Sequence, residues 1–506
     1  MAAEPPLRLR SFLAILRDSG LLLETRAPED LAVTGVAQDS RILREGQLFL
    51  AWTGSAADAH DFLPQALERG AGAAVVERFC EPSELPQIRV RDGRRAAALL
   101  AQAAAGHPGD ALRIVAVTGT NGKTTVTGLV RQLLSPREPA AALGTLGVTG
   151  PDGRPVPGSG GLTTPGPVEL AQRMAGLRDA GVRTLALEAS SHALEQRRLD
   201  GVPVDVACFT NLTQDHLDYH PTLDDYREAK ARLLTLLRDD SSGVVVNGMD
   251  PAWQKLPALR GPLLRTGVAG VELSGPPSVE IHPDLTAHDV SLSAQESRFT
   301  LRQGKEEAPV TTSLLGRFNV ENALVAAGAT LMQGIPLSDV ARTLGQVQAP
   351  AGRMEVTVRG PVPVILDYAH TPDALEKALA TLQPLFHGRL ILVFGAGGDR
   401  DREKRPLMGR VAAQGADLPI VTSDNPRTED PEAIVDDIIA GMGNASHLRI
   451  TDRREAIARA LELAREGDVV LLAGKGHETY QVVGTEVRDF DERKVVRELL
   501  GLEVAP

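Results

Sequence analysis

The sequence predicts an α/β protein of three domains with largely parallel sheets. Short runs rich in Val, Ile and Leu alternate with helical patterns along most of the chain, which is typical of buried strands connected by helices. The 506 residues exceed the about 100–200 of a single compact domain. Segments at 106–110 and 346–355 contain Gly and Pro between such patterns and indicate linkers. We therefore expect domains at residues 1–107, 108–349 and 350–506.

The elements of the first domain follow from these patterns in chain order. Arg and Asp interrupt the apolar patch near the N-terminus, so it indicates the start of a helix and not a signal peptide. Val- and Ile-containing runs predict strands at 47–52, 73–77 and 87–90. Helical patterns predict helices at 62–70 and 94–106.

The central domain is expected to open at residue 113 with a buried strand, a glycine loop and a helix. Further strands are expected at 184–190, 204–212 and 243–248. Polar and apolar residues alternate from about 278 to 303, which indicates an antiparallel edge or satellite sheet, and a helix is expected at 316–334. The last domain repeats strand–helix units, with strands at 362–370, 390–397, 418–425 and 468–476.

Composition excludes several classes of protein. The net charge is −12 and aromatic residues make up 3%, which does not favour binding to a nucleic-acid backbone or base stacking. Two cysteines, Cys80 and Cys208, cannot build a disulfide framework or a Cys-rich zinc site. No run approaches the about 20 apolar residues of a membrane span. We expect a cytoplasmic protein that acts on small molecules, without nucleic acid or membrane insertion, and as a monomer.

Lysine is rare in this chain. Of 54 basic residues, 8 are Lys and the rest are Arg. Such a chain keeps a Lys by chance or where it needs a primary amine. The lysines are Lys123, Lys230, Lys255, Lys305, Lys377, Lys404, Lys475 and Lys494.

The loop from Thr118 to Thr125 predicts a phosphate-binding site. Its sequence TGTNGKTT lies between a strand and a helix, where backbone N–H groups and the helix dipole can cradle a phosphate. Lys123 would reach the terminal phosphates and Thr124 would ligate Mg²⁺. Val117 replaces the first glycine of the standard P-loop, so the motif is a variant. The alternative is a glycine-rich turn that only opens a helix.

Polar residues at the ends of two further strands are candidate metal ligands. Glu188 ends one strand, and Asn211, Asp215, His216, Asp218 and His220 follow another. A carboxylate at such a strand end can hold Mg²⁺, directly or through water. Taken alone, Glu188 is equally a capped strand end, and His216 is equally a hydrogen-bonding loop residue.

These motifs resemble the Mur ligases, a family of ATP-dependent amino-acid ligases of peptidoglycan (cell-wall) precursor synthesis. TGTNGKTT, LEASSHAL, TNLTQDHLDYH, GRFNVENALVAA, GRME, DYAHTP and GKGHETY occur in the family's order across essentially the whole chain. SSHAL, TQDHLDYH and SDNPR are most similar to the MurE-type branch, which adds the third residue of the peptide. The resemblance implies an N-terminal UDP-binding domain, a central P-loop ATPase domain and a C-terminal Rossmann-like domain.

The resemblance also implies a reaction and its nucleotide and metal sites. ATP would phosphorylate the free carboxylate of UDP-MurNAc-L-Ala-D-Glu, and an amino acid's amine would displace phosphate from the acyl phosphate. The catalytic positions would be Lys123, Lys230, His216 and Arg353. The ATP positions would be Gly119, Thr120, Asn121, Gly122, Lys123, Thr124, Thr125, Asn322, Arg353, Asp367 and His370. The metal positions would be Thr124, Glu188, His216 and Lys230.

The substrate carrying the uridine nucleotide is assigned by the same matches. The resemblance implies that the muramoyl dipeptide contacts Thr163, Thr164, Ser190, Gln196 and Arg198. Ser40, with Asp58 to His60 nearby, matches the UDP-binding segment, although Ala59 replaces a glycine of the family's pattern.

Lys230 matches a lysine that the family carbamylates to N6-carboxylysine. A primary amine can lose its proton and take up CO₂ to become an anionic oxygen ligand for Mg²⁺, whereas a guanidinium stays protonated. Without the resemblance, Lys230 reads as a surface lysine on an amphipathic helix.

The acceptor amino acid is expected to bind the C-terminal domain. The resemblance implies a pocket lined by Arg400, Asp424, Asn425, Arg427, Gly474 and Glu478. A guanidinium grips a carboxylate through two hydrogen bonds, so Arg427 favours meso-2,6-diaminopimelate over L-lysine or L-ornithine. Those two acceptors stay open, because Arg replaces Lys throughout this chain. A P-loop small-molecule kinase and a non-catalytic scaffold are more distant alternatives, and the charged run 401–405 is expected to be a solvated loop or helix start.

Overall fold

The computed structural model describes residues 7–54, 57–81, 83–213, 219–254, 256–257, 259–270 and 283–503. The chain divides into two compact units. The first comprises Met1–Gly267, Glu272–Asp284 and Val325–Ile335. The second comprises Val268–Val271, Leu285–Leu324 and Pro336–Pro506. In the described part of the chain no helix is long and apolar enough to cross a membrane.

The N-terminal sheet has the strand order β2-β7-β6-β5-β4 and is parallel except for β2. Helices α1 and α3 pack on one face of this sheet and α2 packs on the other. Each strand contributes to both faces, because its alternate residues point to opposite sides. Leu48 and Leu50 pack in the cluster with α1 and α3, whereas Phe49 packs in the cluster with α2. The bounds are β1 (Leu7–Arg8), α1 (Leu9–Asp18), β2 (Leu22–Thr25), β3 (Ala32–Val33), β4 (Val36–Ala37), β5 (Leu48–Leu50), α2 (Leu63–Glu68), β6 (Ala73–Val76), β7 (Gln87–Val90) and α3 (Gly93–Ala104).

The central sheet runs in the order β10-β9-β11-β8-β12-β13-β14 and is parallel except for β10. Parallel pairing brings the carboxyl ends of β8, β11 and β12 to one edge, where ligands of open α/β sheets bind. The bounds are β8 (Arg113–Thr118), α4 (Lys123–Leu134), β9 (Ala140–Gly144), β10 (Gly147–Thr149), α5 (Pro167–Asp179), β11 (Thr184–Glu188), α6 (Ser191–Glu195), β12 (Val206–Phe209), α7 (Leu223–Ala231), β13 (Gly243–Asn247) and β14 (Leu263–Val268).

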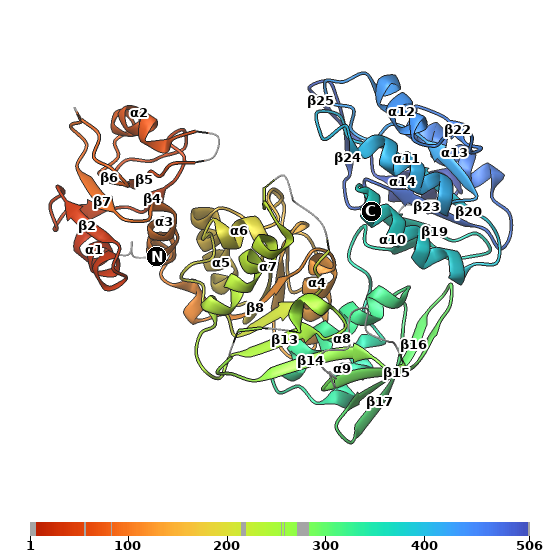
Figure 1. Ribbon diagram of the computed structural model, residues 1–506. Coiled ribbons are helices and arrows are strands. Elements are labelled where there is room, and N and C mark those ends of the chain that lie inside the picture. The colour runs from red at the N-terminus through yellow and green to blue at the C-terminus, as the bar shows by residue number, and fades with distance from the viewer. Residues whose placement is uncertain are drawn as a thin grey trace. The chain divides into compact units, whose positions relative to one another are not determined.

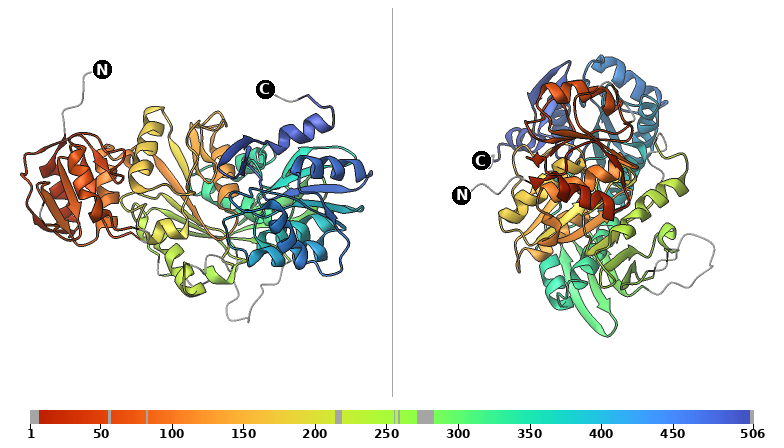
Figure 2. Two further views of the ribbon diagram at one scale, coloured as in Figure 1. Left: turned by 90° about the horizontal axis from the view of Figure 1, so that it is seen from above. Right: turned by 90° about the vertical axis from the view of Figure 1, so that its left-hand side faces the viewer.

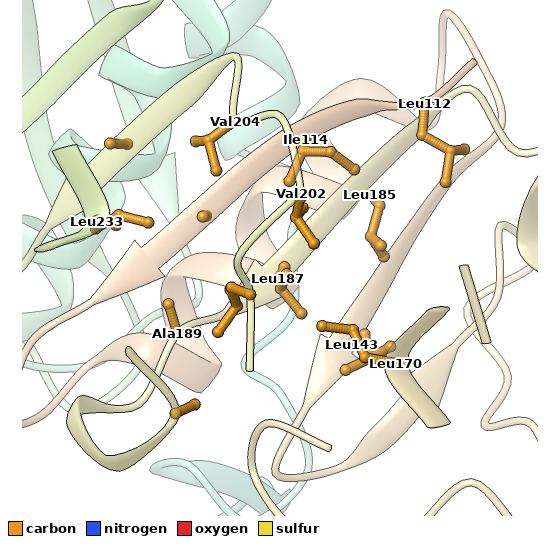
Figure 3. Packing of buried hydrophobic residues seen from close by; sticks show 14 of the residues in the cluster. Leu112, Ile114, Leu143, Leu170, Leu185, Leu187, Ala189, Val202, Val204 and Leu233 are labelled. Atoms are coloured by element: carbon orange, nitrogen blue, oxygen red, sulfur yellow. The ribbon is translucent and has the colours of Figure 1, made fainter. Parts of the chain in front are cut away.

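A large apolar core lies on one face of this sheet. Leu143 of β9 lies beside Leu170 of α5, and Ile114 of β8 and Leu185 of β11 belong to the same cluster (Figure 3). Every one of these side chains is almost fully removed from water. The predicted linker 106–110 is packed as well, because a Cβ at Gly109 would lie 2.5 Å from Pro203 Cδ.

The second unit begins with an antiparallel meander, β15-β16-β17, as the alternating pattern predicts. Its green ribbons can be followed in Figures 1 and 2. Burial alternates along β17, so that Ala308, Val310 and Thr312 face inward. The bounds of these elements and of the two helices that follow are β15 (Leu285–Leu292), β16 (Ser297–Gln303), β17 (Glu306–Thr312), α8 (Arg317–Leu331) and α9 (Leu337–Leu344).

The C-terminal sheet has the order β18-β19-β23-β20-β21-β22 and is parallel except for β18. Helices cover both of its faces, α10 to α12 on one and α13 with α14 on the other. The bounds are β18 (Glu355–Val358), β19 (Val364–Asp367), α10 (Pro372–Leu382), β20 (Leu390–Phe394), α11 (Lys404–Gly415), β21 (Leu418–Val421), α12 (Pro431–Ala440), β22 (Leu448–Arg449), α13 (Arg453–Leu463), β23 (Val469–Ala473), β24 (Tyr480–Val483), β25 (Glu486–Asp489) and α14 (Glu492–Leu499).

The predicted α/β fold with N-terminal, central and C-terminal domains is confirmed, and the domain boundaries at 107 and 349 stay predictions. The charged run 401–405 contains a helix start, as predicted, because α11 begins at Lys404. The prediction that the run is solvated was wrong for Arg405, which is fully buried. Its guanidinium is held by Glu429 and Asp437, which offset the cost of removing the charge from water.

Candidate functional site

The glycine loop connects β8 to α4 and has the backbone that a phosphate cradle requires. Gly119 and Gly122 have φ angles of 146° and 86°, which residues with a Cβ rarely adopt. A Cβ at Gly119 would also lie 1.8 Å from Thr210 Oγ1. The first turn of α4 contains no acidic residue, so its positive dipole end is not neutralised.

Lys123 bonds within this loop, and two buried polar atoms of the loop have no partner among the described residues. Lys123 Nζ donates to the carbonyl oxygens of Gly119 at 3.0 Å and Thr120 at 2.8 Å. Thr118 Oγ1 and Asn121 Nδ2 are buried without a hydrogen-bond partner in the described residues. Buried donors without partners are costly, so these atoms fit a loop that binds a polar ligand. Thr124, the predicted metal ligand, is buried in the first turn of α4.

The end of β12 braces the loop. Thr210 Oγ1 donates to the Asn121 carbonyl at 2.6 Å, and the Asn121 N–H donates to Asn211 Oδ1 at 3.0 Å. The Thr120 N–H donates to the Asn211 carbonyl at 2.7 Å. Asn211 therefore positions the glycine loop. His216, a predicted catalytic residue and metal ligand, lies outside the described residues.

Glu188 lies at the end of β11 and is 1% exposed. Thr145 donates to it twice, from its N–H to Oε1 at 2.9 Å and from its hydroxyl to Oε2 at 3.2 Å. Gly144 makes room for the carboxylate, because a Cβ there would lie 2.0 Å from Oε1. Nothing in the sequence marks Thr145, which is 43 residues from its partner and belongs to no motif.

The residues predicted to bind the muramoyl dipeptide form one network beside Glu188. Thr164 Oγ1 donates to the Glu188 carbonyl at 2.7 Å and accepts from the Ser190 N–H at 3.1 Å. Arg198 donates to the Thr164 carbonyl at 2.8 Å and to Gln196 Oε1 at 2.7 Å. Thr163 joins the network through a 3.1 Å hydroxyl contact with Thr145. Burial lowers the pKa of Arg198.

Lys230 lies on α7 and is 1% exposed, so it is not a surface lysine. Its Nζ donates to the Gly119 carbonyl at 2.8 Å and lies 4.1 Å from the centre of the Tyr226 ring. The Tyr226 ring also packs against His220, with ring centroids 5.1 Å apart. His220 Nε2 contacts Ser191 Oγ at 3.0 Å. The structure therefore places the Lys230 amine directly at the glycine loop.

The described residues include no cluster of three or more His, Cys, Asp or Glu side chains that could hold a metal ion. The predicted metal ligands near the loop that offer an oxygen atom are the Thr124 hydroxyl and the Glu188 carboxylate. Such hard ligands suit Mg²⁺, which usually keeps several waters and takes only one or two carboxylates from the protein. The donor chemistry therefore fits Mg²⁺, and an oxygen on Lys230 would add to it.

The predicted UDP segment packs beside the dipeptide network. Ser40 Oγ donates to Gln65 Oε1 at 2.6 Å, and a Cβ at Gly166, two residues after Thr164, would meet Gln38 Nε2 at 2.5 Å. Near by, His60 accepts from the Glu77 N–H at 3.0 Å through Nε2.

Asp58 contacts His60 Nδ1 at 2.5 Å and holds the 3-10 turn that contains Ala59. Burial opposes ionisation of Asp58, but hydrogen bonds from Arg78 and His60 outweigh it and hold its pKa below the usual range. His60 is thus fully engaged by the protein, which indicates a structural role.

Three residues predicted to close over the nucleotide lie together in the second unit. The Met354 N–H donates to Asp367 Oδ2 at 2.8 Å, and the Arg353 guanidinium lies 4.9 Å from the centre of the Tyr368 ring. His370 packs against the same ring, with centroids 4.5 Å apart. Burial raises the pKa of Asp367, and the charge of Arg353 opposes the shift. Asn322 lies apart from these residues on α8, where Nδ2 donates to Asn319.

The predicted acceptor pocket is built from loops after β20, β21 and β23, which are neighbours in the sheet. Asn425 Nδ2 donates to Glu478 Oε2 at 2.8 Å, and a Cβ at Gly474 would lie 2.5 Å from Asp424 Oδ2. Close approach of these loops therefore depends on glycine at 474.

Two arginines flank the loop after β20. A Cβ at Gly397 would meet Arg427 at 2.9 Å and Arg400 at 3.8 Å. Arg427 donates to the Gly398 carbonyl at 2.8 Å, and its backbone, at φ 50°, pairs with Val483. The Arg427 guanidinium and the Arg400 side chain thus both lie beside Gly397, although they come from two different loops. A guanidinium can grip a carboxylate through two hydrogen bonds.

Comparisons with known proteins agree with this geometry. Residues 117–330 match the family described as the Mur ligase middle domain, and residues 352–476 match the Mur ligase, glutamate ligase domain. A UDP-N-acetylmuramoyl-L-alanyl-D-glutamate–2,6-diaminopimelate ligase from Gloeobacter violaceus is 42% identical, covering 98% of this chain and 99% of the relative. A ligase of the same name from Geobacillus kaustophilus is 42% identical, covering 92% and 94%.

Solved structures show the same fold. A 2,6-diaminopimelate ligase structure of the same name aligns with a TM-score of 0.69 at 34% identity, covering 98% of this chain and 99% of that one. MurF from Thermotoga maritima, solved with ADP, aligns with a TM-score of 0.61 at 20% identity, covering 92% and 96%, and shares the fold. With relatives this similar along almost its whole length, the chain belongs to the Mur ligase family.

Proposed function

We propose that this chain is an ATP-dependent acid–amino-acid ligase that joins meso-2,6-diaminopimelate to UDP-N-acetylmuramoyl-L-alanyl-D-glutamate. ADP and phosphate are released. The observation that carries the proposal is the roughly 40% identity, over nearly the full chain, to ligases named for this reaction. Arg400 and Arg427, which both lie beside Gly397, support it independently of those names. We further propose that the enzyme acts in the cytoplasm as a monomer, without nucleic acid.

In the first step, the dipeptide carboxylate attacks the γ-phosphate of ATP and ADP leaves, giving an acyl phosphate. Phosphoryl transfer asks mainly for positioning and neutralisation of charge. The glycine loop and the start of α4 would hold the ATP phosphates, and Lys123 would leave the Gly119 and Thr120 carbonyls to reach them. Arg353 would complete the neutralisation, and Arg198 and Thr164 would position the carboxylate.

Thr124, Glu188, His216 and Lys230 are the residues that would hold Mg²⁺. When bound, the ion neutralises phosphate charge. The Lys230 ammonium group would lose one proton, and the neutral amine would then form a C–N bond with CO₂ and release a second proton, which gives an anionic carbamate. Lys230 is buried and its amine donates to the Gly119 carbonyl. A carbamate formed on this amine would therefore carry its oxygen atoms beside the glycine loop.

In the second step, the acceptor amine attacks the acyl carbon and phosphate leaves through a tetrahedral intermediate. Arg400 and Arg427 would bind a carboxylate of the acceptor, and Glu478 would bind an ammonium group. Diaminopimelate carries both groups at its distal end, whereas lysine and ornithine lack the distal carboxylate. An arginine pair is therefore most useful with diaminopimelate.

The test is an acceptor panel. The full chain is mixed with ATP, Mg²⁺ and UDP-MurNAc-dipeptide, and each amino acid is scored for ADP, phosphate and tripeptide. Turnover with diaminopimelate in clear preference to lysine and ornithine is expected. Equal or better turnover with lysine or ornithine would overturn the acceptor assignment. A phosphorylated product without amide formation would instead indicate a small-molecule kinase.

A further inference from the structure

Lys475 is a buried cation behind the proposed acceptor pocket. It is 0% exposed, although it follows β23 in a loop. Its Nζ donates to Asn425 Oδ1 at 3.2 Å and to Glu478 Oε2 at 3.3 Å, and lies 3.8 Å from Asp424 Oδ1. One amine therefore contacts three pocket residues from two different loops.

The backbone around Lys475 directs the side chain inward. Gly474 and Gly476 have φ angles of 114° and 54°, so both neighbours occupy conformations that favour glycine. A Cβ at Gly476 would lie 2.9 Å from the Tyr368 Cα. The loop is thus pressed against the ends of β19 and β21, and the amine enters the space between them.

Asn425 has one possible orientation because of this contact. Its Oδ1 accepts from Lys475 and from the Val482 N–H at 2.9 Å, so Nδ2 must face Glu478. A flipped amide would set an N–H group against both donors. Lys475 and the hairpin strand β24 together fix this side chain.

Glu478 is held by one oxygen only. Oε2 accepts from both Asn425 and Lys475, while Oε1 has no hydrogen bond to any described residue. The side chain keeps 14% of its surface exposed. Oε1 is thus the oxygen left to accept an ammonium group, and its direction depends on the two contacts to Oε2.

We propose that Lys475 is a positioning residue for acceptor recognition. It balances the carboxylates of Asp424 and Glu478 and fixes Asn425, so that Glu478 presents Oε1 to the ammonium group of the acceptor. The inference rests on the proposed function for the identity of that acceptor. A lysine suits the position because three oxygens surround a single nitrogen, whereas a planar guanidinium spreads its donors over a fork.

The first experiment measures the KM of each substrate in the full-length Lys475→Met variant. The KM for diaminopimelate should rise at least about 10-fold, while those for ATP and UDP-MurNAc-dipeptide stay within about twofold. Lys377→Met is the matched control, because Lys377 is exposed on α10 and pairs with Asp373. An unchanged acceptor KM, or an equal rise in all three, would overturn the inference, the second because it indicates a merely structural role.

The second experiment is a double-mutant cycle with Glu478→Gln. If Lys475 acts through Glu478, adding Lys475→Met to Glu478→Gln should change the acceptor KM by less than about threefold. Multiplication of the two single effects would contradict the inference. If the single Lys475→Met variant does not fold, the Glu478→Gln variant is compared with the double variant. This comparison still tests the inference, because both proteins lack the carboxylate charge of Glu478 that Lys475 would have to balance.

The cycle is measured with whichever acceptor the wild-type chain uses. Failure of diaminopimelate in the wild-type chain overturns the proposed acceptor and leaves the role of Lys475 to be decided by the cycle. Turnover of diaminopimelate without coupling between Lys475 and Glu478 overturns the role of Lys475 alone.

Discussion

At the scale of single residues, burial distinguishes Lys230 and Lys475 from lysines that lie on the surface. Lys230 and Lys475 are almost completely buried and contact defined oxygens, whereas Lys377 is exposed and pairs within its own helix. The sequence bias towards Arg draws attention to the remaining lysines, but only packing shows which of them are placed in a site. The burial and contacts of each lysine therefore show whether it belongs to a candidate site, which the number of lysines alone does not.

Lys230→Ala should reduce ligase activity at least about 100-fold, because the variant cannot form an anionic oxygen at the glycine loop. Short carboxylates such as acetate should partly restore it by occupying the space left behind. Phosphate release measured with and without acetate checks both statements. Lys377→Ala should behave as wild type, and full activity of Lys230→Ala would remove the carbamate proposal.

Gly144→Ala should lower both activity and stability. The added methyl would overlap Glu188 Oε1, which lies 2.0 Å from the Cβ position, so that the carboxylate or β9 must move. Overpacking of this kind costs about 1–3 kcal/mol. Thermal unfolding and phosphate release are the measurements. Gly176→Ala is the control, since Gly176 lies in α5 with no atom within 4 Å of its Cβ position; equal loss in both variants would contradict the prediction.

At the scale of elements, buried ion pairs attach helices to the loops of the C-terminal sheet. Arg405 in the first turn of α11 binds Glu429 and Asp437, and Arg453 at the start of α13 binds Glu492 of α14. Arg453 also donates to the Ala473 carbonyl at 2.9 Å, immediately before the acceptor loop. These buried arginines therefore hold the loops in place through their ion pairs and hydrogen bonds.

Acid should weaken this attachment. The hydrogen bond from Arg405 lowers the pKa of Glu429 from 4.5 to about 2. Because the folded-state pKa is the lower one, the pair stabilises fully above pH about 4.5, and its contribution is lost as pH falls towards 2. Urea unfolding of wild type at a series of pH values should therefore show stability falling across this window.

Glu429→Gln is the matched variant for this window. It should be less stable than wild type at pH 7, because Arg405 loses a charged partner. The difference between the two proteins should shrink as pH falls from 4.5 to 2, because wild type is then protonated at Glu429. A difference that is constant with pH would contradict the assignment of the pair.

The elements also show what could be predicted from the sequence. The strand, loop and helix at 113–134 were predictable because their pattern and their glycines are local. Thr145 as the partner of Glu188 was not, because long-range hydrogen bonds carry no local signal. For the same reason Arg405 could not be distinguished from its exposed neighbours Arg402 and Glu403, since the same charge pattern serves a solvated run and a buried pair.

At the scale of the whole molecule, the candidate site residues are divided between the two compact units. The glycine loop, Glu188, Lys230 and the dipeptide network belong to the first. The acceptor loops, from Arg400 to Glu478, belong to the second, as do Arg353 and Asp367. The α/β class followed from the strand–helix alternation, but this division did not, because the β15–β17 meander groups with the second unit while preceding the predicted boundary at 349.

This division predicts that the two chemical steps can be separated by substitution. Without an acceptor amino acid, the wild-type chain with ATP and UDP-MurNAc-dipeptide should form the acyl phosphate, which borohydride reduction traps. Arg427→Ala should trap as much product as wild type but show an acceptor KM at least about 10-fold higher, because it loses a charged hydrogen bond. Lys123→Met should trap none, since it lacks the cation for the phosphates. Loss of trapping in Arg427→Ala would show that Arg427 also serves the first step, and would contradict its assignment to acceptor binding alone.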